Sequence, residues 1–400
     1  MRLVARKVPG IARRFGAIVR PSLPVVVALS LLGCGGTDDS AEVALETGPL
    51  VEGAVNESQL AAGASSFLGL AALEEGGLAA VRVVVDGAEA RTSPPSVVAQ
   101  DRTFAGLMGL ELPGGDWLIS ATGCARADDG ACEVEGATLF RLADDDQLEE
   151  LGTFAELTSN TYSITGAVSD TRIVVESVRS LESSAQSQFW VVDLVAGSIE
   201  ALAWVPPPLP VADSVDEGPV GSRASCVTGS QLTLVDTIRS ADTSTVAMTT
   251  VDIEDSRAGN AAPLAVDGIP KGILCHEDNS RTVIALDQDA RFLSASILDD
   301  AGKVAHEERL DWPAELNGLA FAPSSVTAVF ATTPTAAERA RGAEDPVDGP
   351  GESSSVIAFA ASAWIQSPVA PARGERTFVS ADGKSFAAIR APFEIRAWAR

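Results

Sequence analysis

Residues 271–310 read KGILCHEDNSRTVIALDQDARFLSASILDDAGKVAHEERL, and this stretch has the clearest strand pattern in the chain. Runs rich in apolar and β-branched residues alternate with polar turns: the runs are 272–275, 281–286, 291–298 and 303–310, and the turns are 276–280, 287–290 and 299–302. Asp- and Gly-rich turns between short β-prone runs are typical of hairpins. The stretch therefore predicts four antiparallel strands joined as a meander.

The same layout recurs elsewhere in the chain, at 172–202, 231–259, 317–326 and 377–386, with weaker versions at 107–121 and 137–142. The aspartates that end the third runs, Asp193, Asp252 and Asp299, lie 59 and 47 residues apart. A four-strand unit repeated at this spacing is typical of the blades of a β-propeller. We expect an all-β chain with six or seven four-stranded blades. The alternative is two or three β-sandwich domains.

Two of the strand–turn–strand units are Phe-Ala-Pro-Ser-Ser-Val at 321–326 and Ser-Ala-Asp-Gly-Lys-Ser-Phe at 380–386. With the apolar runs that end in Asp, they make the chain resemble bacterial six- or seven-bladed propellers with degenerate repeats, over about residues 160–400. The resemblance implies a fold and no particular activity, because propellers host binding and catalysis alike. The last unit shows only three strands before Arg400. We expect residues 65–95 to supply the fourth and close the ring.

The first forty residues have the features of a targeting segment. Six basic residues precede an apolar run at 23–32, which ends in Leu31-Leu32-Gly33-Cys34. This pattern is typical of an export signal, and the run is too short to span a membrane. Cys34 after Gly33 makes the segment similar to a bacterial lipobox, whose cysteine is acylated. An ordinary secretory signal is the alternative.

These features predict the organisation of the chain. We expect a lipoprotein signal peptide at 1–33, a flexible acidic tether at 34–64 and a propeller-like domain at 65–400. The Pro- and acid-rich segment 339–355 is expected to be a disordered surface loop within that domain. The protein is expected to be exported and lipid-anchored to the bacterial cell envelope, at the outer membrane or cell surface rather than the inner membrane.

The charge balance limits the partners. The formal net charge is −26 at pH 7 and becomes −32 without residues 1–33, which hold six basic residues and no acidic one. An anionic surface repels nucleic acid and anionic membrane faces, so we expect no nucleic-acid partner and membrane contact only through the lipid. Solubility in a salty habitat explains the acidity, and cation binding is the alternative. The expected partner is an envelope protein or a glycan.

The cysteines suggest disulfides. With Cys34 acylated, Cys124, Cys132, Cys226 and Cys275 remain, an even number in an exported chain. Three pairings are possible, and we favour Cys124–Cys132 with Cys226–Cys275. Four unpaired thiols are the alternative.

Motifs that carry chemistry are scarce. The sequence has two histidines, His276 and His306, so one chain cannot supply a site with three histidine ligands. Gly383-Lys384-Ser385 lacks the upstream glycine of a phosphate-binding loop, and Asp144-Asp145-Asp146 lacks the spacing of a calcium loop. The six tryptophans are expected to pack between blades. No catalytic residue, metal site or cofactor is therefore predicted, and bound Ca²⁺ is the alternative.

These observations favour a non-enzymatic binding or scaffold module with an unknown ligand. The alternative is a propeller-type hydrolase or lactonase that uses channel carboxylates and Ca²⁺.

Overall fold

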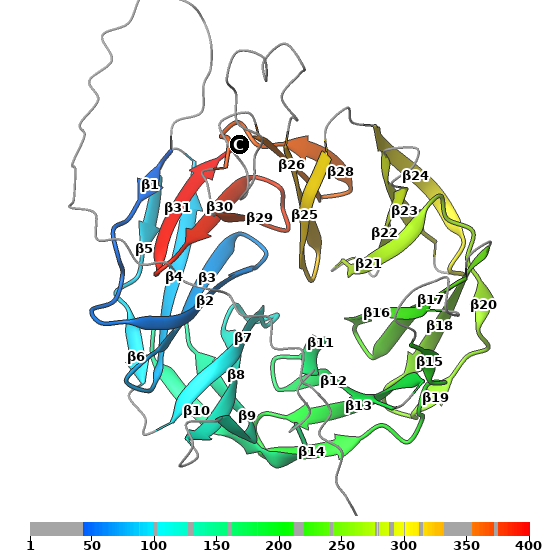
Figure 1. Cartoon of the computed structure of the whole chain (residues 1–400), viewed down its shortest axis with the longest axis horizontal. Helices are drawn as coiled ribbons and strands as arrows, with labels where there is room; N and C mark the ends of the chain where they lie inside the picture. The colour runs from blue at the N-terminus through cyan, green and yellow to red at the C-terminus, as the bar shows by residue number, and fades with distance from the viewer. Residues whose placement is uncertain are drawn as a thin grey trace, which may run out of the picture. The chain divides into compact units, whose positions relative to one another are not determined.

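The computed structural model describes residues 43–400, apart from residue 88 and residues 99–101, 127–131, 158–161, 182, 212–219, 241–242, 277, 279, 288–291, 300, 312–314, 332–353 and 372–374. These residues form seven antiparallel sheets (Figure 1). In each sheet the innermost strand comes first in a run of consecutive strands, and in one sheet the outer strand comes from the start of the described chain. We number the sheets as blades 1 to 7 in chain order. The chain is therefore a seven-bladed β-propeller, within the predicted range of six or seven blades.

The blades have the following strands. Blade 1 comprises β2 (Val55–Ala62), β3 (Ser66–Leu73), β4 (Leu78–Asp86), β5 (Glu89–Thr92) and β6 (Ser96–Val98). Blade 2 comprises β7 (Thr103–Glu111), β8 (Trp117–Arg126), β9 (Cys132–Leu142) and β10 (Leu148–Phe154). Blade 3 comprises β11 (Tyr162–Ser169), β12 (Arg172–Ser180), β13 (Ser184–Asp193), β14 (Ser198–Ala201) and β15 (Leu209–Pro210). A short 3-10 helix, η1 (Ala155–Leu157), follows β10.

Blades 4 to 7 follow the same plan. Blade 4 comprises β16 (Val220–Thr228), β17 (Gln231–Ser240), β18 (Thr243–Asp252), β19 (Arg257–Ala258) and β20 (Ala262–Pro263), and blade 5 comprises β21 (Ile269–Cys275), β22 (Arg281–Asp287), β23 (Phe292–Leu298) and β24 (Val304–Asp311). Blade 6 comprises β25 (Glu315–Ala322), β26 (Ser325–Ala331), β27 (Ser354–Ala360) and β28 (Ala363–Gln366). Blade 7 comprises β29 (Arg376–Val379), β30 (Ser385–Arg390), β31 (Glu394–Ala399) and β1 (Leu45–Glu46).

The blades close into a ring through their innermost strands. Contacts join β2 to β7, β7 to β11, β11 to β16, β16 to β21, β25 to β29, and β29 back to β2. The remaining seam, between blades 5 and 6, is closed by the ring of Phe321 in β25, which occupies the space where a Cβ on Gly272 of β21 would lie. Every blade therefore packs on two neighbours, and a sandwich arrangement is ruled out for the described residues.

The ring is closed by a different segment from the one expected. Residues 65–95 do not close it, because β3 and β4 are the second and third strands of blade 1. The closing strand is β1, in which Leu45 pairs with Ala397 and Glu46 with Arg396 of β31. Residues 43–64 thus hold β1 and β2 and belong to the propeller, so the expected tether is too long at its C-terminal end. A two-residue strand leaves no apolar run by which to recognise it.

The hydrophobic core lies between the blades. Seven buried clusters fill the seven seams of the ring, one for each pair of neighbouring blades. Trp117 lies fully buried between blades 1 and 2, and Trp398 between blades 6 and 7. Trp190, Trp204 and Trp364 pack at the margins of other seams. The prediction of inter-blade tryptophans holds for these five, and Trp312 lies outside the described residues.

The inner and middle strands of a blade are buried on both faces because a neighbouring blade covers each side of the sheet. In β22 the run Thr282 to Leu286 is buried throughout, whereas the outer strand β24 alternates between exposed and half-buried residues. This explains why the apolar runs lack a clean two-residue alternation.

Strand ends are capped by the repeated aspartates. Asp193 accepts bonds from the amides of Val195 and Ala196, and Asp252 and Asp299 cap the corresponding turns of blades 4 and 5.

Several expected features lie outside the described residues: the signal segment with Cys34, most of the loop 339–355, and the side chains of Cys124 and Cys132. Ser354 and Ser355 at the end of that loop begin β27. The strands that carry Cys124 and Cys132, β8 and β9, pair with each other. Within the described part of the chain, no helix has the length and apolar character needed to cross a membrane.

The seam between blades 3 and 4 contains a buried carboxyl group. Glu176 of β12 is 7% exposed and accepts hydrogen bonds from Ser187 Oγ at 2.6 Å and Ser225 Oγ at 3.0 Å. Burial raises the pKa of Glu176 above its ordinary value, and the two hydroxyls and the charge of Arg223 offset this only in part. The folded protein therefore binds a proton at Glu176 more tightly than the unfolded chain does.

Stability at this site should fall as pH rises from the unfolded pKa of Glu176 to its higher folded pKa, because the unfolded chain ionises first. We expect Glu176→Gln to be more stable than the wild type at pH 7, by about 1.4 kcal/mol for each unit of the pKa rise. The difference should vanish at pH values below the unfolded pKa. Urea unfolding of both proteins across that pH range measures it, and parallel pH profiles would contradict the assignment.

Candidate binding cavity

A cavity opens at one end of the propeller axis. The seven innermost strands run in the same direction along the axis, and the cavity is lined by their last residues and by the turns that follow. Its volume is about 1040 Å³, and all seven blades contribute to its wall. The lining segments are 62–64, 110–113 with 115, 165–168, 226–229, 275–276 with 278, 322–325 with 361–362, and 381–382.

Polar contacts join neighbouring blades around this wall. The amides of Ala381 and Asp382 in blade 7 donate to the carbonyls of Gly63 and Ala64 in blade 1, at 2.9 and 3.1 Å. The Ala64 amide donates in turn to the carboxylate of Glu111 in blade 2. These bonds tie the turns of three consecutive blades into one rim, so the wall is held in place by backbone groups.

Other seams of the wall use different contacts. The Gly114 amide of blade 2 donates to Asp170 Oδ1 of blade 3 at 2.5 Å. Between blades 3 and 4, Val227 lies so near Gly166 that a Cβ on the glycine would approach it to 2.9 Å. Ser325 Oγ of blade 6 donates to the Val379 carbonyl of blade 7 at 3.0 Å. Glycine at 166 is thus required by close approach of two inner strands.

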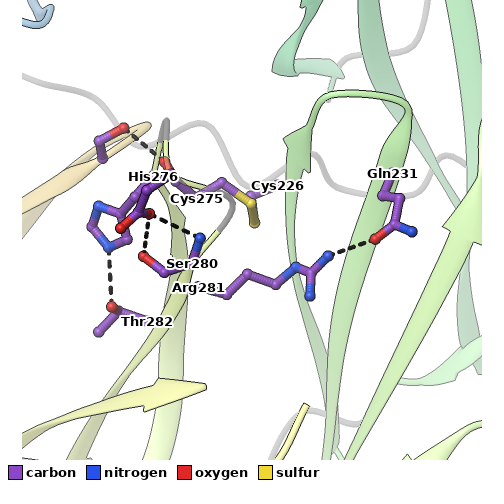
Figure 2. Close-up of a disulfide and its surroundings, with 9 residues drawn as sticks. Cys226, Gln231, Cys275, His276, Ser280, Arg281 and Thr282 are labelled. Carbon is purple, nitrogen blue, oxygen red and sulfur yellow. Dashed lines mark hydrogen bonds between the residues drawn. A yellow bond between two sulfur atoms is a disulfide. The ribbon is translucent and has the colours of Figure 1, made fainter. Parts of the chain in front are cut away.

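A disulfide joins blades 4 and 5 at the cavity wall (Figure 2). Cys226 of β16 is bonded to Cys275 of β21, which is the pairing predicted from the sequence. Their Cα atoms lie 5.8 Å apart. On the other side of Cys275, its amide donates to the Pro323 carbonyl at 3.1 Å, and its carbonyl accepts from Ser324 Oγ at 2.7 Å. Cys275 is therefore linked to both neighbouring blades, covalently to one and by hydrogen bonds to the other.

His276 follows the disulfide and lines the cavity. Its Nε2 lies 3.0 Å from Thr282 Oγ1, a hydroxyl on a residue that is fully buried (Figure 2). Burial lowers the pKa of His276, and the nearby charge of Asp278 offsets this only in part. The ring is therefore neutral at neutral pH. Because Thr282 is sealed beneath the wall, its hydroxyl is out of reach of a ligand, and the pair does not form an accessible nucleophile and base.

Three carboxylates line the cavity, each from a different blade. Glu111 accepts bonds from the Ala64 amide and from Ser66 Oγ. Hydrogen bonds from Ser280 lower the pKa of Asp278. For Asp382, burial favours the neutral acid, but hydrogen bonds from Ser380 and Lys384 outweigh it and lower the pKa. Asp278 and Asp382 are therefore ionised at neutral pH.

The side-chain positions do not favour a metal site. Across the described residues, no three His, Cys, Asp or Glu side chains are grouped so that they would hold a metal ion. Asp144, Asp145 and Asp146 lie in the turn between β9 and β10, where Asp144 is paired with Arg82 at 2.8 Å. His306 lies on the outer strand β24 with its side chain 63% exposed. The structure brings neither of these motifs to the cavity.

Sequence reasoning singled out Cys226, Cys275 and His276 but not Glu111, Asp382 or the hydroxyls of the wall. Glu111 ends an inner strand, and Asp382 lies in the turn that follows another. That shared position is the signal that would have found them, because the ends of parallel inner strands meet at one end of the axis.

Comparisons with known proteins match the fold only. No protein-family model matches the sequence, and no curated protein matches it either. Among solved structures, the β-propeller domain of the Trilobed protease from Pyrococcus furiosus is similar with a TM-score of 0.46 and 7% identity, covering 85% of this chain and 95% of that one. A protein of unknown function from Dyadobacter fermentans has a TM-score of 0.42 and 12% identity, covering 80% and 99%.

A third solved structure, the tricorn protease, has a TM-score of 0.44 and 11% identity and covers 91% of this chain and 34% of its own. The seven sheets of the described residues, not these similarities, show the fold of a seven-bladed propeller.

Proposed function

We propose that the protein is a non-catalytic binding module of the cell envelope, and that it binds its partner in the axial cavity. The observation that carries the proposal is the cavity itself, about 1040 Å³ in volume with a wall built from all seven blades. Ligand sites are commonly concave, largely preformed and of about 300–1,000 Å³. The rim bonds and the disulfide between blades supply the preformed wall.

Binding suits the wall better than catalysis does. Several polar groups of the wall are engaged in holding it: Glu111 binds the Ala64 amide, Ser324 binds the Cys275 carbonyl and His276 lies against a sealed hydroxyl. Acyl transfer needs a nucleophile within reach of a base, and metal-assisted hydrolysis needs a grouped ligand set. No observation on the described residues favours the hydrolase alternative.

A protein partner suits the lining better than a glycan does. The described lining residues include no Trp, Tyr or Phe. Aromatic side chains supply large amphipathic contact surfaces, which a stacked sugar ring would need. The lining instead offers small residues, backbone groups and short polar side chains, which suit an extended polypeptide segment.

Site-specific crosslinking in cells tests the site. A photoreactive residue at Ala64, on the cavity rim, is expected to capture a reproducible envelope protein. The same residue at Glu75, in the exposed turn between β3 and β4 at the other end of the axis, should not. Ala64→Trp, which places an indole at the cavity mouth, should abolish capture from a second rim position, Ser362. Equal capture from Ala64 and Glu75 would contradict the proposal.

The lipid anchor at Cys34 is a separate part of the proposal and rests on the lipobox-like sequence. We expect Cys34→Ser to move the protein from the membrane fraction to the soluble fraction and to stop incorporation of labelled fatty acid. Cys34 should be the site of all the incorporated label. Unchanged fractionation of the variant would show that the anchor proposal is wrong, without affecting the cavity.

A further inference from the structure

We infer that the cavity selects a basic ligand: an extended segment of a partner protein whose lysine or arginine side chains enter the cavity. This inference rests on the proposed function and specifies the chemistry of the partner. It is carried by the charge of the lining and by the charge of the surrounding turns.

The lining has a one-sided charge. Glu111, Asp278 and Asp382 come from blades 2, 5 and 7, and the described lining residues include no lysine or arginine. Lys384 approaches Asp382 at 3.3 Å, but its side chain is 83% exposed. An ion pair in water is weak, so Lys384 leaves most of this negative potential in place. Three blades therefore direct negative charge at the same cavity.

The turns around the cavity extend this charge. Because consecutive strands reverse direction, the turns after the first and third strands of each blade lie at the cavity end of the axis. Acidic residues occupy these turns in five blades: Asp144 to Asp146, Asp170, Asp193, Asp252, Glu254, Asp255, Asp278, Asp299 and Asp382. Arg82 pairs with Asp144 and Asp146, and Arg172 pairs with Glu254.

This charge distribution affects how fast charged ligands associate with the cavity. A concave site surrounded by charge of one sign raises the local concentration of oppositely charged ligands and their association rate. With a net charge of −26, the whole chain adds to that field. A basic segment is drawn toward the cavity, whereas an acidic segment or a nucleic acid is repelled.

The test measures fluorescence anisotropy of labelled peptides bound to the full chain. The probes alternate serine with lysine, glutamate or glutamine, and spermidine is the competing small amine. We expect the lysine peptide to saturate, with an affinity that falls as salt is raised, and the glutamate peptide to show no binding. Spermidine should compete only weakly. Tighter binding of spermidine than of the lysine peptide would overturn the choice of a protein segment.

Charge-matched variants locate the effect. Asp278→Asn/Asp382→Asn removes two charges from the cavity, and asparagine keeps the acceptor oxygen of each turn. It should weaken the lysine peptide about tenfold. Glu74→Gln/Glu75→Gln removes two charges from the turn between β3 and β4 and should change affinity less than twofold. Equal loss of affinity for the lysine peptide in both double variants would overturn the inference. Asp278→Asn alone repeats the test with a single substitution at an exposed residue.

The outcomes separate the two proposals. If the glutamine peptide binds as tightly as the lysine peptide, and Ala64→Trp blocks both, the cavity is a binding site and the inference about charge is wrong. If Ala64→Trp leaves the binding of the lysine peptide unchanged, the ligand lies elsewhere and both the inference and the proposed site are wrong.

Discussion

Replacing Cys226 and Cys275 together by alanine is expected to lower the free energy of unfolding by about 4 kcal/mol, mainly by releasing a constraint on the unfolded chain. The bond closes a loop with a sequence separation of 49 residues. It also joins the inner strands of blades 4 and 5, which are not consecutive strands of one sheet. Without it, the seam depends on the buried cluster formed by the two blades.

Urea unfolding of the wild type and the double variant measures this effect. With Cys124 and Cys132 replaced by serine in both chains, a thiol reductant should destabilise the chain that keeps Cys226 and Cys275 by a similar amount and leave Cys226→Ala/Cys275→Ala unchanged. That chain keeps both sulfur atoms when reduced, so the comparison separates the covalent link from the packing of the side chains. An unfolding midpoint that does not respond to reduction would contradict the prediction.

A chain that begins at residue 51 should lose on the order of 5 kcal/mol relative to one that begins at residue 40. The shorter chain lacks β1 and the residues around it. The lost hydrogen bonds join Ala44 to Ala397, Thr47 to Ile395 through both backbone and side chain, and Leu50 to Phe393. Leu45 and Leu50, which pack against the cluster between blades 7 and 1, are lost as well.

The shorter chain should also aggregate more readily, because β31 becomes an exposed edge with unpaired backbone groups. Thermal unfolding and light scattering of the two purified chains test both effects. Leu45→Ala in the longer chain is the matched control for packing alone and should cost less than the deletion. Equal stability of the two chains would show that β1 does not close the ring.

The repeated aspartates made the fold predictable. Asp193 and Asp252 end third strands, Asp299 directly follows one, and all three cap the turns there, so one local requirement recurs in three consecutive blades. Such local rules are visible in sequence. Closure depends instead on pairing between segments about 350 residues apart, such as Leu45 with Ala397. Nothing local to Leu45 indicates that partner, which is why the boundary of the tether was misplaced.

The cavity was less predictable than the fold. The disulfide between Cys226 and Cys275 followed from cysteine counting, but its position at an axial wall did not. Glu111, Asp278 and Asp382 are separated by more than a hundred residues each and meet only because the ring is closed. As single acidic residues next to turns they resemble solvated surface charge. Their common role follows from topology, not from a motif.

The affinity of the crosslinked envelope partner for three full-length chains tests the central claim most directly. The chains are the wild type, Ala64→Trp at the cavity mouth and Glu75→Trp at the other end of the axis. A cavity-binding module predicts at least a tenfold loss for Ala64→Trp and no change for Glu75→Trp. Equal affinity of all three chains would contradict the claim that the axial cavity is the binding site.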